Sequence, residues 1–282
     1  MTAESIVGST DVAAVPVVEV RDLCKTYHHG GLLGSTHVTA VDQVSFALPA
    51  RTTLAIVGES GSGKTTVARM IMGLETPSSG AIAFFGVPRP GRMRARDRRR
   101  HARVIQMVFQ NPYRSLDPRQ RAGDAVDEIL RAHTELDRAG RRGRTQELFD
   151  LVRLSPALLG SLPAELSGGQ RQRVCIARAL ASSPQAIILD EAISALDVLV
   201  QAQVLNLLQD VQHETGVSYL FVTHDLSVVR QSADEVLVMQ SGRAVERGPV
   251  DKVLDAPQHP YTQRLMASVP RPGWRPGAVS AG

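Results

Sequence analysis

The sequence predicts an α/β fold with buried strands and an inserted α-helical subdomain. Three observations predict it. Short apolar runs at 53–57, 186–189 and 217–222 have the composition of buried strands. A helical pattern follows the first run after a glycine-rich loop, as in a strand–loop–helix unit. Residues of about 111–182 change in composition to turns and helical stretches, which interrupt the α/β pattern.

Length and composition limit the class of protein. The chain has 282 residues and a mass of 30.4 kDa, enough for one large domain or two modest ones. With 43% hydrophobic and 21% charged residues, it is neither disordered nor fibrous in composition. We expect one domain over 17–269, a flexible N-terminus over 1–16 and a flexible tail over 270–282.

Two further patterns bear on location. No uncharged apolar run approaches the roughly 18 residues of a membrane-spanning helix. The first 15 residues contain Glu4 and Asp11 and no apolar block, so we do not expect a secretory signal. Cys24 and Cys175 form no CxxC motif, which is typical of a reducing compartment and predicts that each fills space in or near the core. A soluble protein inside the cell is expected.

The charge is concentrated in one segment. The net charge is +4, and residues 89–103 hold eight arginines and a single acid, Asp97. We interpret this cluster as a charged helix face or loop before a strand at 104–109. Because no aromatic residues alternate with the arginines, a stacking platform for single-stranded nucleic acid is not supported, and no nucleic-acid partner is expected.

The remaining elements follow in chain order. In the N-terminal part we predict an edge strand at 17–23, a glycine-rich connection at 28–35, a strand at 41–48, the buried strand at 53–57 and a helix at 66–74. In the inserted part we predict helices at 122–133 and 145–154. Beyond it we predict a helix at 200–211 that Gly216 can end, and a hairpin of 236–239 with 244–246 across Ser241-Gly242.

The loop after the first buried strand carries the clearest chemistry. It reads Gly58-Glu59-Ser60-Gly61-Ser62-Gly63-Lys64-Thr65-Thr66 and fits G-x-x-x-x-G-K-[ST] between a strand and a helix. Glycines let successive N–H groups point at one centre, and the helix adds its positive end. Lys64 can reach terminal phosphates, and the Thr65 hydroxyl can bind Mg²⁺. The sequence therefore predicts binding of a nucleoside triphosphate with Mg²⁺.

Two carboxylates end the strand at 186–189. Asp190 and Glu191 lie at its carboxyl end, where open α/β sheets bind ligands. Asp190 is placed to hold Mg²⁺, and Glu191 points another way and can act as base toward an attacking water. An apolar run ending in Asp-Glu is a weak signal alone, but it becomes strong beside the phosphate-binding loop.

A second anion pocket is predicted at the start of a helix. Leu166-Ser167-Gly168-Gly169-Gln170 precedes Arg171-Gln172-Arg173 and an apolar run at 174–181. This run, with the loop and the Asp-Glu pair in the same order, resembles the signature of ATP-binding cassette (ABC) ATPases. The resemblance covers about 17–269 and implies an α/β P-loop NTPase fold, with a RecA-like core, an antiparallel β subdomain and the inserted α-helical subdomain.

The resemblance also implies roles for single residues. Tyr27 is similar to the aromatic that stacks on adenine, and Gln110 to the glutamine that joins Mg²⁺ and senses the membrane partner. His224 is similar to the histidine that contacts the γ-phosphate, and Ser194-Ala195-Leu196-Asp197 to a loop at the dimer interface. In the family two cassettes pack head to tail, which implies that Ser167, Gly168, Gly169 and Gln170 belong to the partner's nucleotide site.

Two stretches narrow the resemblance to a subfamily. Residues 110–119 and His259-Pro260-Tyr261-Thr262, within a C-terminal motif at about 250–269, are similar to ATPases of oligopeptide, dipeptide and nickel importers. This implies ATP hydrolysis that drives import, with two transmembrane permease subunits, a second ABC ATPase (a copy or a paralogue) and, indirectly, an extracytoplasmic substrate-binding protein. The implied location is peripheral, at the cytoplasmic face of the plasma membrane.

The sequence departs from the family after Glu191. Ala192-Ile193 stands where Pro-Thr is usual, so we expect a difference in loop rigidity and in dimer communication. Some relatives carry a cysteine cluster in the tail for an iron–sulfur centre, but no cysteine follows Cys175.

Other functions stay open at this point. An ABC ATPase accessory to a carbon–phosphorus lyase complex would share most of these motifs. A DNA- or ribosome-associated ABC protein would require a long coiled-coil insertion or two cassettes. A generic P-loop kinase would leave the Ser167–Gln170 motif unexplained.

Overall fold

A six-stranded sheet runs through the middle of the structure, which is a computed structural model that describes residues 15–31, 34–91, 93–110 and 115–268. In sheet order its strands are Arg243–Pro249 (β10), Glu235–Gln240 (β9), Thr53–Val57 (β3), Ser218–Val222 (β8), Ala186–Asp190 (β7) and Ile105–Val108 (β6). All neighbours pair in parallel except β10 with β9. Every residue of β3, β7 and β8 is buried, because both faces of this sheet are covered.

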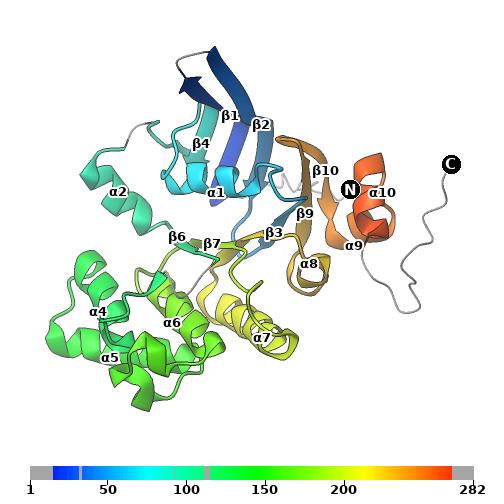
Figure 1. Cartoon of the computed structure of the whole chain (residues 1–282). Helices are drawn as coiled ribbons and strands as arrows, with labels where there is room; N and C mark the ends of the chain where they lie inside the picture. Colours follow the sequence, from blue (N-terminus) through cyan, green and yellow to red (C-terminus); the bar gives the residue numbers. More distant parts are fainter. Residues whose placement is uncertain (1–14, 32–33, 92, 111–114, 269–282) are drawn as a thin grey trace, which may run out of the picture.

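An antiparallel sheet of four strands packs above the first (Figure 1). Its order is Gly34–Leu48 (β2), Val18–Gly31 (β1), Ser79–Phe84 (β4) and Val87–Pro88 (β5). The strand predicted at 17–23 is confirmed as part of β1, but its predicted edge position is wrong, because β1 pairs with β2 on one side and β4 on the other. The predicted connection at 28–35 is also wrong in part, since the β1–β2 ladder continues to Gly31 opposite Gly34. Pairing with a neighbouring strand overrides the weak strand preference of glycine there.

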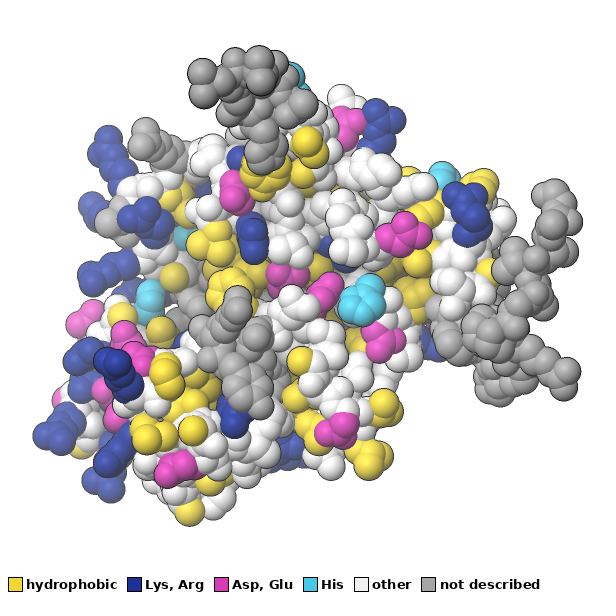
Figure 2. Space-filling model, viewed as in Figure 1, with side chains coloured by type: hydrophobic (Ala, Val, Ile, Leu, Met, Phe, Trp, Pro, Cys, Tyr) yellow, Lys and Arg dark blue, Asp and Glu magenta, His cyan; other side chains and the backbone are white. Residues whose placement is uncertain are grey.

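The arginine-rich segment forms a helix, one of the two predicted possibilities. It spans Ala95–Ala102 (α2), and the Arg94 N–H donates to the Asp97 carboxylate at its start. In Figure 2, Lys and Arg side chains gather along the left side of the molecule. In the same view, Figure 1 shows α2 on this side, with the inserted helices below it.

Between β6 and β7, the described part of the chain forms helices and turns and contains no strand. They are Ala122–His133 (α4), Arg138–Leu151 (α5), the 3-10 turns Pro156–Gly160 (η1) and Pro163–Glu165 (η2), and Gly168–Leu180 (α6). The bounds predicted for α4 are confirmed. α5 begins before the predicted residue 145, because the Asp137 carboxylate accepts a hydrogen bond from the Gly140 N–H and caps a polar first turn.

The remaining helices flank the large sheet. Lys64–Met72 (α1) follows β3, Val198–Thr215 (α7) precedes β8, and Leu226–Ser232 (α8), Val250–Asp255 (α9) and Pro260–Ala267 (α10) complete the fold. Gly216 ends α7 with φ 72°, as predicted. The predicted hairpin is confirmed as β9–β10, with Ser241 and Gly242 at φ 47° and 84°.

Two hydrophobic cores lie on the two faces of the large sheet. One joins it to the antiparallel sheet and α1, and the other joins it to the helices of the inserted and C-terminal parts. Cys175 lies in the second core, and burial raises the pKa of its thiol to about 11. Cys24 is half-buried, near the core, and both thiols are free. Within the described ranges, no helix has the length and apolarity needed to cross a bilayer.

Candidate active site

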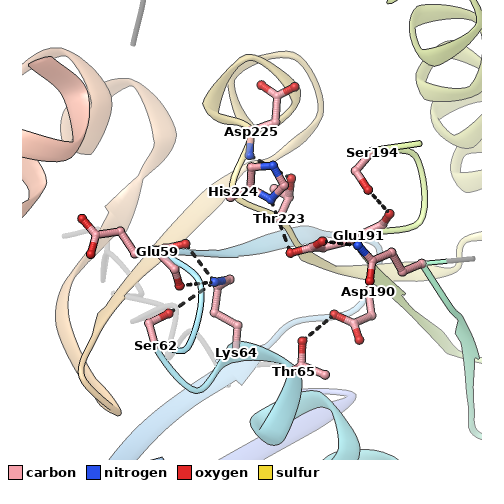
Figure 3. Close-up of polar contacts among 12 residues, drawn as sticks. Glu59, Ser62, Lys64, Thr65, Asp190, Glu191, Ser194, Thr223, His224 and Asp225 are labelled. Carbon is pink, nitrogen blue, oxygen red and sulfur yellow. Dashed lines mark hydrogen bonds and ion pairs between the residues drawn. The ribbon is translucent and has the colours of Figure 1, made fainter. Parts of the chain in front are cut away.

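The five parallel strands of the large sheet present their carboxyl ends at one edge, and the polar residues predicted for catalysis gather there (Figure 3). Lys64 and Thr65 come after β3, Asp190 ends β7 with Glu191 directly after it, and His224 follows β8. Because parallel strands present their carboxyl ends together, segments far apart in sequence meet here.

Tight packing explains the glycines of the loop at 58–63. A Cβ on Gly58 (φ 149°) would lie 2.2 Å from the carbonyl oxygen of Met239. A Cβ on Gly63 (φ 100°) would lie 2.3 Å from the carbonyl oxygen of Ala40. These positions therefore exclude any side chain. Gly61 (φ 81°) faces open space instead, on the exposed side of the loop with Ser60.

The Lys64 ammonium lies inside the curve of this loop. Its Nζ donates to the carbonyl oxygens of Gly58 (2.8 Å) and Glu59 (2.7 Å) and to the Ser62 hydroxyl (3.3 Å). The residue is only 5% exposed. Burial lowers the pKa of Lys64, against the opposing effect of the carboxylates of Glu191, Asp190 and Glu59. A buried cation at the centre of a ring of backbone groups is suited to an anionic phosphate.

Thr65 and Asp190 form the second part of the site. The Thr65 hydroxyl donates to Oδ1 of Asp190 at 3.1 Å. Burial raises the pKa of Asp190, and the hydrogen bond from Thr65 opposes this rise. Thr65, Asp190 and Gln110 line a pocket of about 430 Å³.

The donor atoms of this pocket fit Mg²⁺. A hydroxyl, a carboxylate and an amide oxygen are hard ligands, and Mg²⁺ is commonly held by one or two carboxylates together with substrate phosphates and waters. No group of three or more His, Cys, Asp or Glu residues in the described chain could hold a metal by itself. Oxygens of a bound nucleotide would complete the ligand set of such an ion.

Glu191 is held in an unusual backbone conformation. Its φ is 48°, in the left-handed region, and its N–H donates to the Val222 carbonyl at 2.8 Å. Its carboxylate accepts a hydrogen bond from Nε2 of Gln110 at 2.7 Å, and its other oxygen lies 3.3 Å from Nδ1 of His224. The carboxylate is thus oriented from two sides, beside the pocket that Thr65 and Asp190 line.

The other predicted binding residues belong to different elements, the start of α6 and strand β1. Ser167 and Gln170 form a capping box at the start of α6, with the Gln170 N–H on the Ser167 hydroxyl (3.2 Å) and the Ser167 N–H on the Gln170 side chain (2.8 Å). Gly168 and Gly169 begin that helix. Tyr27 lies on β1, with Lys25 Nζ 4.9 Å from its ring centre. No hydrogen bond or ion pair found in the described residues joins either group to Lys64 or Glu191.

Sequence reasoning missed two supports of the loop. The Glu59 N–H donates to the hydroxyl of Tyr261, and the Gly242 N–H donates to the carbonyl of Ser62. Tyr261 stood out only as part of a tail motif, and no spacing rule could connect it to the loop. Ala40, Met239 and Gly242 contact the loop through backbone atoms. The residue types at these positions therefore do not indicate the contacts.

The fold and the site together define a P-loop nucleoside triphosphatase. The profile of the ABC transporter family matches residues 41–194, and that of the oligopeptide/dipeptide transporter C-terminal region matches residues 245–279. The chain therefore belongs to the ABC transporter family, as an ATP-binding subunit whose hydrolysis of ATP is coupled to transport. This confirms the predicted fold class and excludes a generic P-loop kinase.

Individual relatives agree with this assignment. The chain is 46% identical over 257 residues to the di/tripeptide transport ATP-binding protein DppF of Pseudomonas aeruginosa, covering 90% of this chain and 79% of that one. It is 45% identical over 275 residues to the glutathione import ATP-binding protein GsiA of Escherichia coli, covering 95% of this chain but 43% of GsiA.

Solved structures show the same fold. The ATP-binding cassette MJ0796, in a dimeric structure bound to ADP and Pi, superposes with a TM-score of 0.73 at 27% identity over 83% of this chain and 98% of that one. CbiO1 from Clostridium perfringens, part of the transporter complex cbiONQ, superposes with a TM-score of 0.74 at 26% identity. The match covers 86% of this chain and 91% of CbiO1.

Proposed function

We propose that this chain powers an importer of di- or oligopeptides. The observation that carries the proposal is the match of residues 245–279 to the C-terminal region of oligopeptide and dipeptide transporters. DppF and GsiA, which are named for di/tripeptide transport and glutathione import, agree in substrate class because glutathione is itself a peptide. Nickel is the alternative cargo within the same subfamily resemblance.

Nucleotide binding is assigned to the loop at 58–66. Lys64 and the backbone of Gly61, Ser62, Gly63 and Thr66 hold the phosphates, and the start of α1 adds its positive end. Tyr27 stacks on the adenine. Thr65, Asp190 and Gln110 hold Mg²⁺, which supplies positive charge to the phosphate oxygens when bound.

Hydrolysis is assigned to Glu191. Its carboxylate accepts a proton from water as the water oxygen attacks the γ-phosphorus, and the bond from that phosphorus to the bridging oxygen of ADP breaks. Gln110 and His224 orient the carboxylate from either side. His224 also steadies the transferred phosphoryl group in the transition state.

The active unit is a head-to-tail pair of cassettes. Ser167, Gly168, Gly169 and Gln170 form the start of α6, whereas this chain's own loop leads into α1, which agrees with a role at the partner's nucleotide. The MJ0796 relative is described as dimeric. ATP closes such a pair because each nucleotide is contacted from both subunits, and hydrolysis releases the contacts. The second cassette is a copy of this chain or a paralogue.

A groove beside Gln110 is the proposed contact surface for the membrane partner. A cavity of about 320 Å³ is lined by Met72, Leu74, Met107, Phe109 and Ile129, among others. Leu74 and Phe109 are 59% and 41% exposed, which leaves apolar surface at this edge. We assign it to two transmembrane permease subunits, which places the chain at the cytoplasmic face of the plasma membrane and links it indirectly to a substrate-binding protein.

Purification of the tagged chain in mild detergent from its native membranes tests this function, with mass spectrometry of the proteins that accompany it. Co-purification of two polytopic permeases would support the importer. Cells that carry only the Lys64→Ala variant should also fail to grow on a required dipeptide, which would support peptide import. Loss of nickel uptake alone would reassign the cargo. Soluble carbon–phosphorus lyase subunits in place of permeases would overturn the import proposal.

A further inference from the structure

The C-terminal helix reaches the phosphate-binding loop through one hydrogen bond. The Glu59 N–H donates to the hydroxyl of Tyr261 at 3.0 Å, across 202 positions of sequence. Tyr261 is in the first turn of α10 and is only 4% exposed, so water competes little for this bond.

This bond acts on a peptide group that the loop's lysine also contacts. The peptide that joins Gly58 to Glu59 presents its carbonyl oxygen to Lys64 Nζ at 2.8 Å and its N–H to Tyr261. The peptide plane is therefore fixed at both ends, once from inside the loop and once from α10. A Cβ on Gly58 would clash with the Met239 carbonyl of β9, so the loop backbone packs directly against that strand here.

The start of α10 is itself held in place by β10. The Glu246 carboxylate accepts hydrogen bonds from the N–H groups of Gln258 (2.8 Å) and His259 (3.1 Å). Nδ1 of His259 then accepts from the Tyr261 N–H at 3.2 Å and caps the helix. A short chain of contacts therefore runs from Glu246 through His259 to Tyr261 and the loop.

We propose that Tyr261 is a positioning residue for the nucleotide site, through which the docked C-terminal helix sets the affinity of the loop for MgATP. A loop already held in its binding conformation loses less entropy when the phosphates bind. The proposal rests on the assignment of MgATP to the loop at 58–66. It gives the region at 245–279 a part in the ATPase cycle.

Tyr261→Phe in the full chain is the direct test, because it removes one hydroxyl and keeps the ring. We expect the Kd for MgATP by calorimetry to rise about five-fold, the effect of one ordinary hydrogen bond. The KM for ATP should rise similarly while kcat at saturating ATP stays unchanged. Hydrogen exchange of the peptide containing Glu59 should become faster.

Tyr219→Phe is a matched control. Tyr219 in β8 is 1% exposed, and its hydroxyl has no hydrogen-bond partner within the described chain. The same chemical change there should leave Kd, KM and loop exchange as in the wild type. A stability effect common to buried tyrosines would move both variants equally, and that result would overturn the proposal.

Glu246→Ala provides an independent route to the same loop. It removes the two hydrogen bonds to residues 258 and 259 and should raise the KM for ATP in the same direction. This variant decides the question if Tyr261→Phe lowers Tm well below the control. Wild-type Kd in both variants would refute the role of Tyr261, whereas a wild-type chain that binds no MgATP would refute the assignment of the loop.

Discussion

The side-chain amide of Gln110 donates a 2.7 Å hydrogen bond to the Glu191 carboxylate, although 81 positions separate the two residues. Strand register accounts for this contact, since Val108 on β6 pairs with Leu189 on β7 and each functional residue follows two positions later. A residue that leads to the inserted helical part therefore touches the proposed base directly.

Glu191→Gln should leave ATP binding intact and stop turnover. The amide keeps the size of the side chain but cannot accept the proton of water, so the rate should fall by two orders of magnitude or more, in line with the roughly 10²–10⁴-fold contribution of a general base. Phosphate release and size-exclusion chromatography with ATP should show a trapped closed dimer. Glu214→Gln, at an exposed position of α7, is the matched control. Unchanged hydrolysis would remove Glu191 from the role of base.

Lys64→Ala should abolish useful nucleotide affinity. The ammonium is the buried cation at the centre of the loop. A hydrogen bond to a charged group contributes about 1.5–3 kcal/mol, so its loss should weaken the Kd for MgATP about ten- to hundred-fold. Calorimetry with MgATP measures this change, and Lys252→Ala, at an exposed position of α9, should bind as the wild type does. Normal affinity in Lys64→Ala would contradict the assignment of the loop.

Ser167→Arg should retain ATP binding in its own loop and lose hydrolysis, because the bulky cation lies where the partner's nucleotide is proposed to bind. It also removes the Ser167 cap of α6, at a cost of about 1 kcal/mol, so Tm must be measured beside activity.

Mixing this variant with Lys64→Ala tests the pairing. A dimer of one chain of each kind contains one site with both parts intact, so ATPase activity should return. Failure to recover activity would show that the partner is not a copy of this chain. Retained hydrolysis in Ser167→Arg alone would refute the interface.

Asp190→Asn should raise Tm in the absence of nucleotide and metal at pH 7.5. Burial raises the pKa of Asp190, so this carboxyl favours folding below its unfolded pKa of about 3.9 and loses that contribution as pH rises through the folded value. The increase in Tm that Asp190→Asn gives over the wild type should therefore become smaller below about pH 4.

Asp225→Asn should do the opposite. Burial acts to raise the pKa of Asp225, but hydrogen bonds from Ser227 and Gln201 outweigh it and lower the pKa. This group stabilises the fold above its unfolded pKa, so the substitution should lower Tm at pH 7.5. Thermal melts at pH 7.5 and pH 3.5 check both signs. Equal shifts in the two variants would contradict the electrostatic explanation.

Several elements were predictable because they depend on nearby residues. The strand at 53–57, the glycine loop with Lys64 and Thr65, helix α4 and the Ser241-Gly242 hairpin follow from apolar periodicity and turn chemistry. Placement of Asp190 and Glu191 at the same edge required only the rule for parallel strands.

The departure at Ala192-Ile193 shows where this reasoning stops. The sequence indicated only that a usual Pro-Thr pair is replaced. In the structure Ala192 and Ile193 are both 4% exposed and belong to the core shared with the helices. The two residues therefore pack in the core next to Glu191, and this packing depends on residues distant in the chain.

The sequence by itself determined the class of chemistry, since a loop for phosphates and two carboxylates after a strand are local patterns. Tertiary structure alone decided that β1 is an inner strand, that Gln110 and His224 flank Glu191, and that Tyr261 supports the loop at Glu59. The physical reason is that strand partners and buried hydrogen bonds are selected by packing between distant segments, and short-range periodicity carries no information about them.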